Sequence, residues 1–327
     1  MALPQYIRDR LSLPVFCAPM FSISGPDLVR EACKAGFVAA LPRRNASDLT
    51  QFDEWLRTIR ADLTDYSAVH RGAPVGPLAA NLNIRAEPAD LEADLDVCQR
   101  HGVEIVVSVA GNPAELIRRV HGRGLLAYHD VTNLRFAEKA IAAGADGLVC
   151  IGAGGGGHSG TISHLALVPR IRAMFDGVIV MAGAIGTGAA VRASEILGAD
   201  LAYIGTRFIA TRESMAADAY KQMLVDHTSA DLLYTPQVAG VAANWLIPSI
   251  RRNGLDPENL PRPTAKGMAH DHLPPEVKPW KSLWSAGQSV DLIQDCPAFA
   301  ELARRLRREY VQACELADMA SAARAGL

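Results

Sequence analysis

The sequence predicts an α/β fold, a (β/α)₈ barrel followed by a smaller helical lid subdomain near the C-terminus. Short apolar runs alternate with helical segments eight times before residue 227. Most of these runs are continuously apolar, which is typical of parallel strands covered on both faces. Glycine-rich motifs follow the sixth, seventh and eighth runs, whereas an open dinucleotide-binding sheet carries its glycine fingerprint after the first strand. These observations favour a closed barrel over an open doubly wound sheet.

Each predicted strand leads into a predicted helix. The strands are expected at 14–18, 37–41, 75–81, 104–109, 125–129, 147–151, 178–182 and 202–205. The helices are expected at 25–35, 46–63, 87–100, 113–121, 134–143, 165–175, 188–197 and 215–225. Two of these helices run into the same Gly-Ala-Asp sequence, at 144–146 and 198–200, where the glycine can serve as a helix C-cap. An apolar strand follows each time, which indicates a repeated β–α step.

The repeating pattern ends near residue 226. Residues 227–290 are rich in proline and hold three of the four tryptophans, Trp245, Trp280 and Trp284. We therefore expect a barrel over 1–226, an irregular or helical lid subdomain over 227–290, and a C-terminal segment over 291–327. The last segment contains an amphipathic helix near 296–322, which is expected to pack on the barrel.

Bulk properties exclude several classes of function. The net charge of −2 and the pI near 6.5 argue against a nucleic-acid or anionic-membrane partner. No uncharged apolar run reaches the roughly 18 residues of a membrane span, and the first residues lack the apolar core of a signal peptide. The six cysteines form no CxxC pair, so neither a metal site nor a redox dithiol is expected. A cytoplasmic protein with buried free thiols fits this pattern.

The segments after the late strands suggest a phosphate site. Barrel enzymes bind phosphate with the loops that follow strands seven and eight, where backbone N–H groups face the anion. Gly183 and Gly205 would let the backbone approach closely, and Thr206 adds a hydroxyl group. One such site suits a mononucleotide such as FMN. The alternative is that these glycines only form tight turns.

Four successive glycines, 154–157, precede His158 after the sixth strand. A run of glycines costs backbone entropy, so it is expected where the main chain lies against a flat ligand. His158 would then project into the barrel mouth as the catalytic residue, with His129 and His164 as weaker rivals. Asn81 ends an apolar strand and could offer a donor and an acceptor to a flavin edge, or cap a turn.

Several blocks together resemble the nitronate monooxygenase family, formerly called 2-nitropropane dioxygenases, which is related to the flavin-dependent enoyl-ACP reductases. The blocks are 14–20, 79–82, 155–160 (GGGHSG), 182–188, 205–211 (GTRFIAT) and 284–288 (WSAGQ). The resemblance implies a TIM barrel with a smaller helical domain and non-covalently bound FMN. It places the catalytic histidine at His158. The positions it assigns to FMN binding are Ala18, Met20, Asn81, Gly156, Gly157, Gly183, Gly205, Thr206 and Gln288.

Two positions depart from the family pattern. Asp130, after the fifth strand, stands where relatives often carry a lysine, and Ala184 stands where they often carry a second glycine. The first change alters the charge expected near the flavin, and the second alters the predicted phosphate loop. Asp130 could orient a histidine or a substrate, or cap the next helix.

The resemblance implies an FMN-dependent nitronate monooxygenase. Such an enzyme oxidises alkyl nitronates or nitroalkanes with O₂ to carbonyl compounds and nitrite, with His158 as base or anion stabiliser. The alternative is an NAD(P)H-dependent FMN reductase that acts on a quinone or an enoyl thioester. A third hypothesis is a flavin-binding module without activity. The expected partners are a small-molecule substrate and O₂, and homodimerisation is left open.

Overall fold

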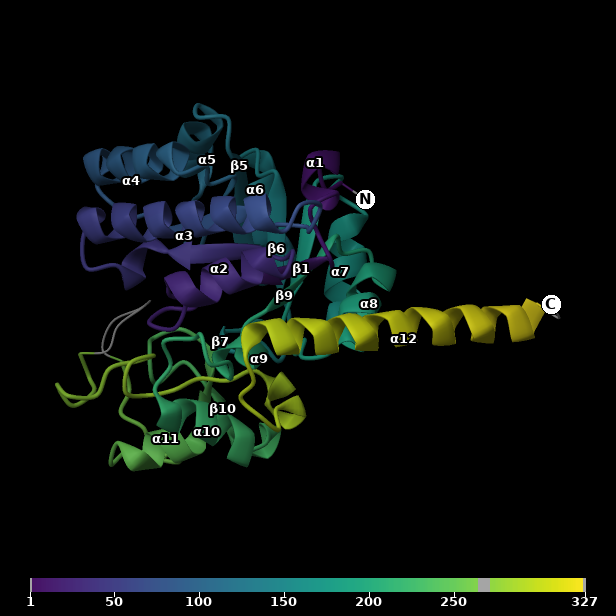
Figure 1. Ribbon diagram of the computed structural model, residues 1–327. Helices are drawn as coiled ribbons and strands as arrows, with labels where there is room; N and C mark the ends of the chain where they lie inside the picture. Colours follow the sequence, from purple (N-terminus) through teal and green to yellow (C-terminus); the bar gives the residue numbers. More distant parts are fainter. Residues whose placement is uncertain (1, 264–270, 326–327) are drawn as a thin grey trace.

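A closed barrel of eight parallel strands forms the centre of the computed structural model, which describes residues 2–263 and 271–325 (Figure 1). The barrel order is β1-β2-β3-β4-β5-β6-β8-β9, so chain order and spatial order agree. The predicted (β/α)₈ barrel is therefore confirmed. Its strands are β1 Val15–Cys17, β2 Val38–Pro42, β3 Leu78–Leu82, β4 Ile105–Ser108, β5 Leu126–Val131, β6 Gly147–Ile151, β8 Val178–Ala182 and β9 Leu201–Ile204.

Helices cover the outside of the barrel, and most begin with a recognisable signal. Asp48, Asn133 and Thr187 each accept a backbone hydrogen bond as the N-cap of the helix that follows. The covering helices are α2 Pro26–Lys34, α3 Leu49–Val69, α4 Pro88–Arg100, α5 Ala114–His121, α6 Leu134–Ala142, α7 His164–Arg172 and α8 Gly188–Ile196. The shorter α1 Gln5–Arg8 and η1 Arg43–Asn45 lie in the connections around β1 and β2.

The eighth covering helix is not the one that the sequence suggested. The expected helix at 215–225 exists as α10 Asp218–Asp226, but its Tyr220 and Leu224 pack with Trp284 outside the barrel core. The long C-terminal helix α12 Phe299–Ala325 packs instead against α8 and α2, the neighbours of the missing helix. Its buried Phe299, Leu302 and Leu306 join the core between strands and helices. The far half of α12 extends away from the body (Figure 1).

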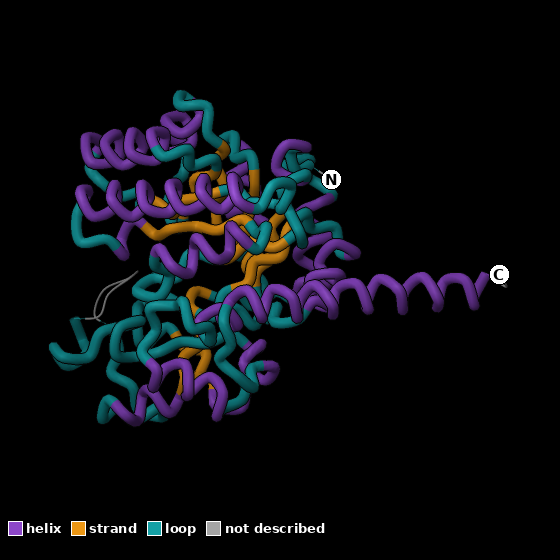
Figure 2. Tube along the Cα trace, in the orientation of Figure 1, coloured by secondary structure: helices purple, strands orange, loops and turns teal. Residues whose placement is uncertain are grey.

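The segment after α10 forms a lobe against the carboxyl ends of the barrel strands, and Figure 2 shows that it mixes strands, short helices and loops. Its β10 Leu232–Thr235 and β11 Ala243–Leu246 are antiparallel strands that were not anticipated. The third strand of this sheet is β7 Gly157–His158, which comes from the barrel loop after β6. The remaining elements near it are α9 Thr206–Ile209, η2 Ser229–Asp231, α11 Ile247–Arg252 and η3 Gln288–Leu292. The domain limits drawn from the sequence stay a prediction.

The strand registers arrange the inward-facing side chains in layers. The pairing can be traced from strand to strand around the barrel, starting with Phe16 and Val38 and closing with Ala202 and Val15. The trace returns to β1 at a position eight residues from where it began. A barrel with this stagger takes the four side chains of each layer from alternate strands. One layer therefore consists of Phe16, Ala79, Tyr128 and Val180, all buried in the barrel interior. The next layer toward the carboxyl ends consists of Ala18, Asn81, Asp130 and Ala182.

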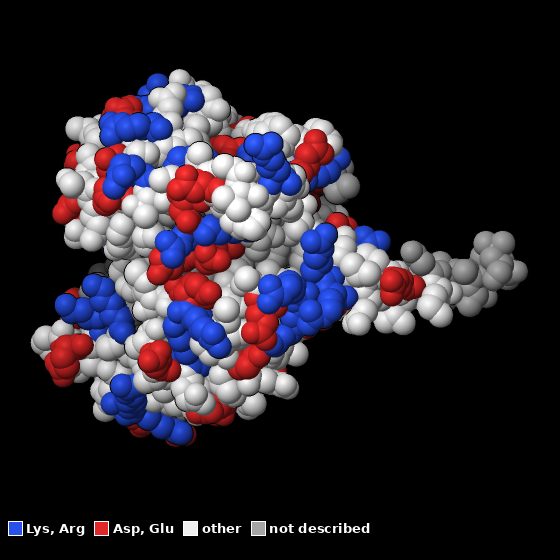
Figure 3. Space-filling model, in the orientation of Figure 1, with Lys and Arg blue, Asp and Glu red and all other residues white. Residues whose placement is uncertain are grey.

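Charge and cysteine placement agree with the composition. Acidic and basic side chains are interspersed over most of the face shown in Figure 3, with a basic group along the first half of α12. All six cysteines are free, and Cys17, Cys33, Cys98 and Cys150 are buried. Within the described ranges no helix has both the length and the apolar character to cross a membrane.

Candidate active site

Small residues surround the opening at the carboxyl ends of the strands. A β-carbon built on Gly205 would lie 3.6 Å from the sulfur of Met20 and 3.8 Å from the β-carbon of Ala18. These three positions therefore meet at one side of the opening. Asn81 lies in the same layer as Ala18, and its amide Nδ2 donates to the carbonyl oxygen of Val107 at 3.1 Å. That bond fixes the orientation of the amide and does not use its Oδ1.

The glycine run after β6 lies against the segment that begins η3. The backbone N–H of Gln288 donates to the Gly154 carbonyl at 2.9 Å, and that of Gly287 donates to Thr206 Oγ1 at 2.9 Å. A β-carbon on Gly156 would come within 2.8 Å of the Gly287 nitrogen. Only glycine permits this approach, so the run brings three distant segments together at the opening.

Two side chains hold the glycine run in place. The buried Asn244 of β11 donates from Nδ2 to the Gly155 carbonyl at 2.7 Å. The Ser159 hydroxyl accepts the Gly155 N–H at 3.1 Å and lies within 3.3 Å of the Gly152 carbonyl. The lobe therefore anchors the loop through Asn244, and Ser159 ties the glycine run back to Gly152, the residue that follows β6.

His158 ends the glycine run as the second residue of β7. It pairs with Ala243 of β11, and its imidazole is half-buried with its ring centroid 5.3 Å from that of Trp280. Trp280 adopts a left-handed backbone conformation at φ 61°, which is uncommon for a bulky residue and characteristic of functional sites. Burial lowers the pKa of His158 below its ordinary 6.5. The imidazole is therefore neutral at pH 7 and able to accept a proton.

The loop after β8 has the shape of a glycine turn even where glycine is absent. Gly183 has φ 124°, and the exposed Ala184 has φ 57°, a conformation that glycine adopts without strain. His164 lies beneath this loop, because its Nε2 is 2.7 Å from the Ala182 carbonyl. A β-carbon on Gly183 would lie 3.0 Å from the His164 ring. His164 thus supports the loop from below.

The other rival histidine lies outside the opening. His129 is buried on the outward face of β5, where its Nδ1 is 2.8 Å from Ser108 Oγ. Burial lowers the pKa of His129 to about 4, so the imidazole is neutral at pH 7. Its Nδ1 is already engaged by the Ser108 hydroxyl. The next residue, Asp130, points inward and belongs to the layer at the opening.

A profile of the nitronate monooxygenase family matches residues 9–309. The chain belongs to this family. The nitronate monooxygenase of Paraburkholderia phytofirmans is 26% identical, over 92% of this chain and 93% of its own length. A hydroxy-methyl-oxo-octahydro-indene-carboxyl-CoA dehydrogenase of Mycobacterium tuberculosis is 28% identical, over 70% of this chain and 61% of its own length.

Solved structures support the same fold. FabK from Thermotoga maritima matches with a TM-score of 0.74 and 21% identity, over 97% of this chain and 99% of its own. The nitroalkane oxidase of Streptomyces ansochromogenes matches with a TM-score of 0.73 and 24% identity, over 94% and 98% of the two chains. As a member of the nitronate monooxygenase family with this barrel, the chain is a flavin-dependent oxidoreductase.

The structure gathers the residues that the family resemblance selected. Asn81 lies within β3 itself. The others lie on the segments that follow the barrel strands or on η3, whose first residue, Gln288, is exposed beside Gly154. The sequence did not single out Trp280, Asn244 or the supporting role of His164. Trp280 and Asn244 lie in the lobe, and no local sequence pattern predicts which residues of the lobe contact the glycine run or His158.

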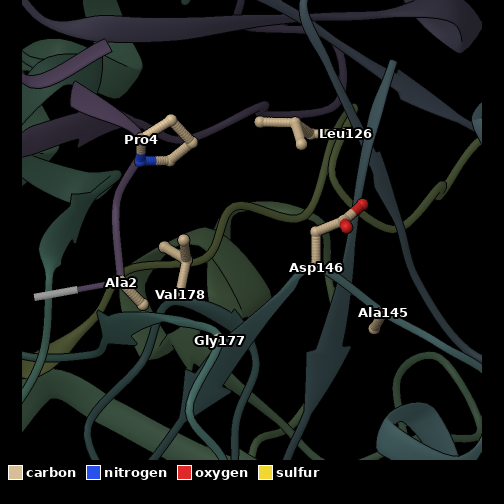
Figure 4. Close-up of a pocket in the computed structure, with 7 residues that line it drawn as sticks. All are labelled: Ala2, Pro4, Leu126, Ala145, Asp146, Gly177 and Val178. Carbon is tan, nitrogen blue, oxygen red and sulfur yellow. The ribbon is translucent and has the colours of Figure 1, made fainter. Parts of the chain in front are cut away.

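A cavity of about 320 Å³ lies at the opposite end of the barrel (Figure 4). Its lining includes Leu126 and Val178, the first residues of β5 and β8, and Asp146. The Asp146 carboxylate is already occupied, because Oδ2 is 2.8 Å from His121 Nε2 and accepts the Ala127 N–H at 2.7 Å. In barrel enzymes the amino ends of the strands serve stability rather than catalysis. This cavity is therefore separate from the candidate active site at the carboxyl ends of the strands.

Proposed function

We propose that the protein is an FMN-dependent nitronate monooxygenase, which oxidises alkyl nitronates or nitroalkanes with O₂ to carbonyl compounds and nitrite. One observation carries the proposal: a neutral, half-buried histidine ends a glycine run at the barrel opening. His158 is the proposed catalytic residue. FMN, when bound, would supply the redox chemistry, and the protein would supply placement and electrostatics.

The residues at the opening fit a flavin mononucleotide. Gly183, Gly205 and Thr206 would hold its phosphate group, since their backbone can approach an anion closely. The layer that contains Ala18 and Ala182 offers little side-chain bulk beneath a planar ring. Asn81 and Asp130 in that layer supply polar groups, and Asp130 Oδ1 is buried with no hydrogen-bond partner in the described part of the chain. The remaining proposed contacts are Met20, Gly156, Gly157 and Gln288.

His158 is suited to remove the α-proton of a nitroalkane. A general base must be unprotonated at the working pH, and the lowered pKa of His158 keeps its imidazole neutral. The proton would be held on a ring nitrogen, and the resulting imidazolium would stabilise the anionic nitronate. Trp280 covers the imidazole from the lobe side, so it shields the proton transfer from bulk water.

The test begins with the absorbance spectrum and the cofactor of the purified protein. FMN released on denaturation identifies the cofactor, and oxygen uptake with propyl nitronate should be accompanied by nitrite and an aldehyde. His158→Asn should retain FMN and lose oxidation of the neutral nitroalkane more than oxidation of the preformed nitronate. A protein that binds no flavin, or one that forms no nitrite from any nitronate, would refute the proposal.

A reductase is the second candidate, because the family is related to the flavin-dependent enoyl-ACP reductases; a relative that is 28% identical is named as a dehydrogenase of a CoA ester, which is also a thioester. In that case NAD(P)H would reduce the flavin, and a quinone or an enoyl thioester would accept the electrons. Anaerobic mixing separates the two functions. Rapid bleaching of the flavin by NADH or NADPH favours the reductase, whereas bleaching by a nitronate alone favours the monooxygenase.

A further inference from the structure

Asp130 occupies the innermost level of the barrel opening. It follows Tyr128 by two residues on β5, so both side chains point into the barrel. The strand registers place Asp130 in one layer with Ala18, Asn81 and Ala182. Three members of this layer are apolar or neutral, and Asp130 is its one ionisable group.

Among the described residues the carboxyl group of Asp130 has no hydrogen-bond partner. Its Oδ1 is buried and makes no hydrogen bond with any described residue, although the side chain as a whole is half-buried. Buried polar groups are nearly always hydrogen-bonded, and an exception requires a reason such as a ligand or a catalytic role. One part of the carboxyl group is thus enclosed by the barrel wall, while another part is open toward the mouth.

Within residues 2–263 and 271–325, no cationic group contributes to the pKa of Asp130. Burial raises the pKa values of Tyr203 on β9 and Cys150 on β6, and the nearby charge of Asp130 raises both further. The phenol and the thiol therefore stay neutral. Burial also raises the pKa of Asp130 to about 7, because no cation offsets the loss of water. The carboxyl group can therefore exchange a proton near neutral pH.

We propose that Asp130 is a second proton-exchanging residue of this active site, which faces the bound flavin ring and binds one proton when the cofactor is reduced. The inference rests on the proposed flavin site but not on the proposed substrate. Electrons that enter the cofactor add negative charge beside an unpaired carboxylate. Proton uptake from solvent removes that repulsion, and the proton is released when the cofactor is oxidised again.

This arrangement links the ease of flavin reduction to pH. Above pH 7 the carboxylate is charged and opposes reduction, so the midpoint potential is lowered. Below pH 6 the carboxyl group is already protonated and its influence is small. Asp130→Asn keeps the shape and polarity of the side chain but cannot titrate. The variant should therefore resemble the low-pH form of the protein at every pH.

The experiment measures proton uptake and midpoint potential during anaerobic photoreduction of the flavin-loaded protein. At pH 8, in weakly buffered solution with a pH indicator, Asp130→Asn should take up about one proton fewer than the unaltered protein. Its midpoint potential should be higher at pH 8, and the difference should vanish below pH 6. Asp65→Asn removes an exposed carboxyl group on the outer helix α3 and should change neither quantity.

Infrared difference spectra keep the test independent of how well the variant folds. Reduction of the unaltered protein at pH 8 should produce the carbonyl band of a protonated carboxylic acid. Absence of that band, or equal proton uptake by the two flavin-loaded proteins, would overturn the role of Asp130. Failure to oxidise nitronates would refute the proposed function alone, whereas a protein without flavin would refute both.

Discussion

The indole ring of Trp280 stands edge-on to the imidazole ring of His158, with the ring centroids 5.3 Å apart and the planes at 63°. The two residues are far apart in sequence and come from different parts of the molecule. His158 belongs to the barrel loop after β6, and Trp280 belongs to the lobe. The same indole lies 5.0 Å from the ring of Trp245, which is fully buried. The lobe core thus reaches the proposed base through a rigid aromatic contact.

Replacing His158 should abolish proton abstraction without emptying the flavin site. His158→Asn should lower kcat/KM for a nitroalkane by about 10²–10⁴-fold, the usual contribution of a general base. Because burial lowers the pKa of His158, the midpoint of the acid limb in the pH profile of kcat/KM should lie below pH 6.5. Steady-state oxygen uptake from pH 5 to 9 measures both effects. If the variant keeps an acid limb with its midpoint above pH 6.5, that limb belongs to a group other than His158.

Removing the indole should make His158 more basic. Trp280→Ala exposes the imidazole to water, so the pKa of His158 should rise toward 6.5 and the acid limb should move to higher pH. Trp280→Phe keeps an aromatic ring and should shift the pKa less. NMR titration of the His158 ring protons reads this directly. An unchanged pKa in the alanine variant would show that other groups exclude the water.

The barrel was largely predictable because its signals are local. Each buried strand is a short apolar run, and helix caps such as Asn133 and Thr187 lie where a helical pattern begins. The eighth helix was misassigned for a physical reason. Segment 215–225 has a helical pattern, but nothing in that pattern says whether the apolar side of α10 meets the barrel or Trp284. Which helix fills a gap between α8 and α2 depends on tertiary packing.

The candidate site could be predicted from the sequence only where the backbone itself imposes the residue type. Gly156 must be glycine because a β-carbon there would contact the Gly287 nitrogen at 2.8 Å. His158 was then marked by its place at the end of the run. Trp280 and Asn244 carried no such mark, since a tryptophan or an asparagine is acceptable in many environments. Asn244 meets the glycine run because β11 pairs with β7, and Trp280 meets His158 because the lobe packs on the opening; short, weakly patterned strands reveal neither contact.

Asn244 is expected to stabilise the loop that carries His158. Asn244→Ala leaves the buried carbonyl of Gly155 without its donor, which should lower the free energy of unfolding by about 1–3 kcal/mol. FMN should also bind more weakly. Thermal unfolding and fluorescence titration of FMN measure these effects. Tyr234→Phe removes a hydroxyl bond to the Ser159 carbonyl from a side chain that is 42% exposed, and should change stability far less.

Ala184 holds a conformation that favours glycine. Ala184→Gly relieves the left-handed strain of roughly 1 kcal/mol but adds backbone entropy to the unfolded chain, so stability should stay the same or rise slightly. Ala184→Val places a branched side chain at φ 57° and should destabilise the loop and weaken FMN binding. Paired unfolding and binding measurements rank the three proteins. A valine variant as stable as the alanine protein would show that the loop adjusts its backbone freely.

Gly188 of α8 packs directly against the backbone of α12, and its replacement tests whether α12 is the eighth helix of the barrel. A β-carbon there would lie 2.0 Å from the Leu306 carbonyl oxygen and 2.3 Å from the Tyr310 nitrogen. Both are backbone atoms that cannot move aside, so Gly188→Ala must push the helices apart. The shift would also disturb the bond from the Gly188 N–H to Glu309 Oε2 at 2.8 Å, and would loosen Leu302 and Leu306 in the core. This overpacking should lower the free energy of unfolding by several kcal/mol.

The exposed neighbour Ala189 provides the control, since Ala189→Gly should lower the free energy of unfolding by only about 1 kcal/mol through helix propensity. Equal unfolding midpoints for the two variants would mean that α12 contributes little to the barrel.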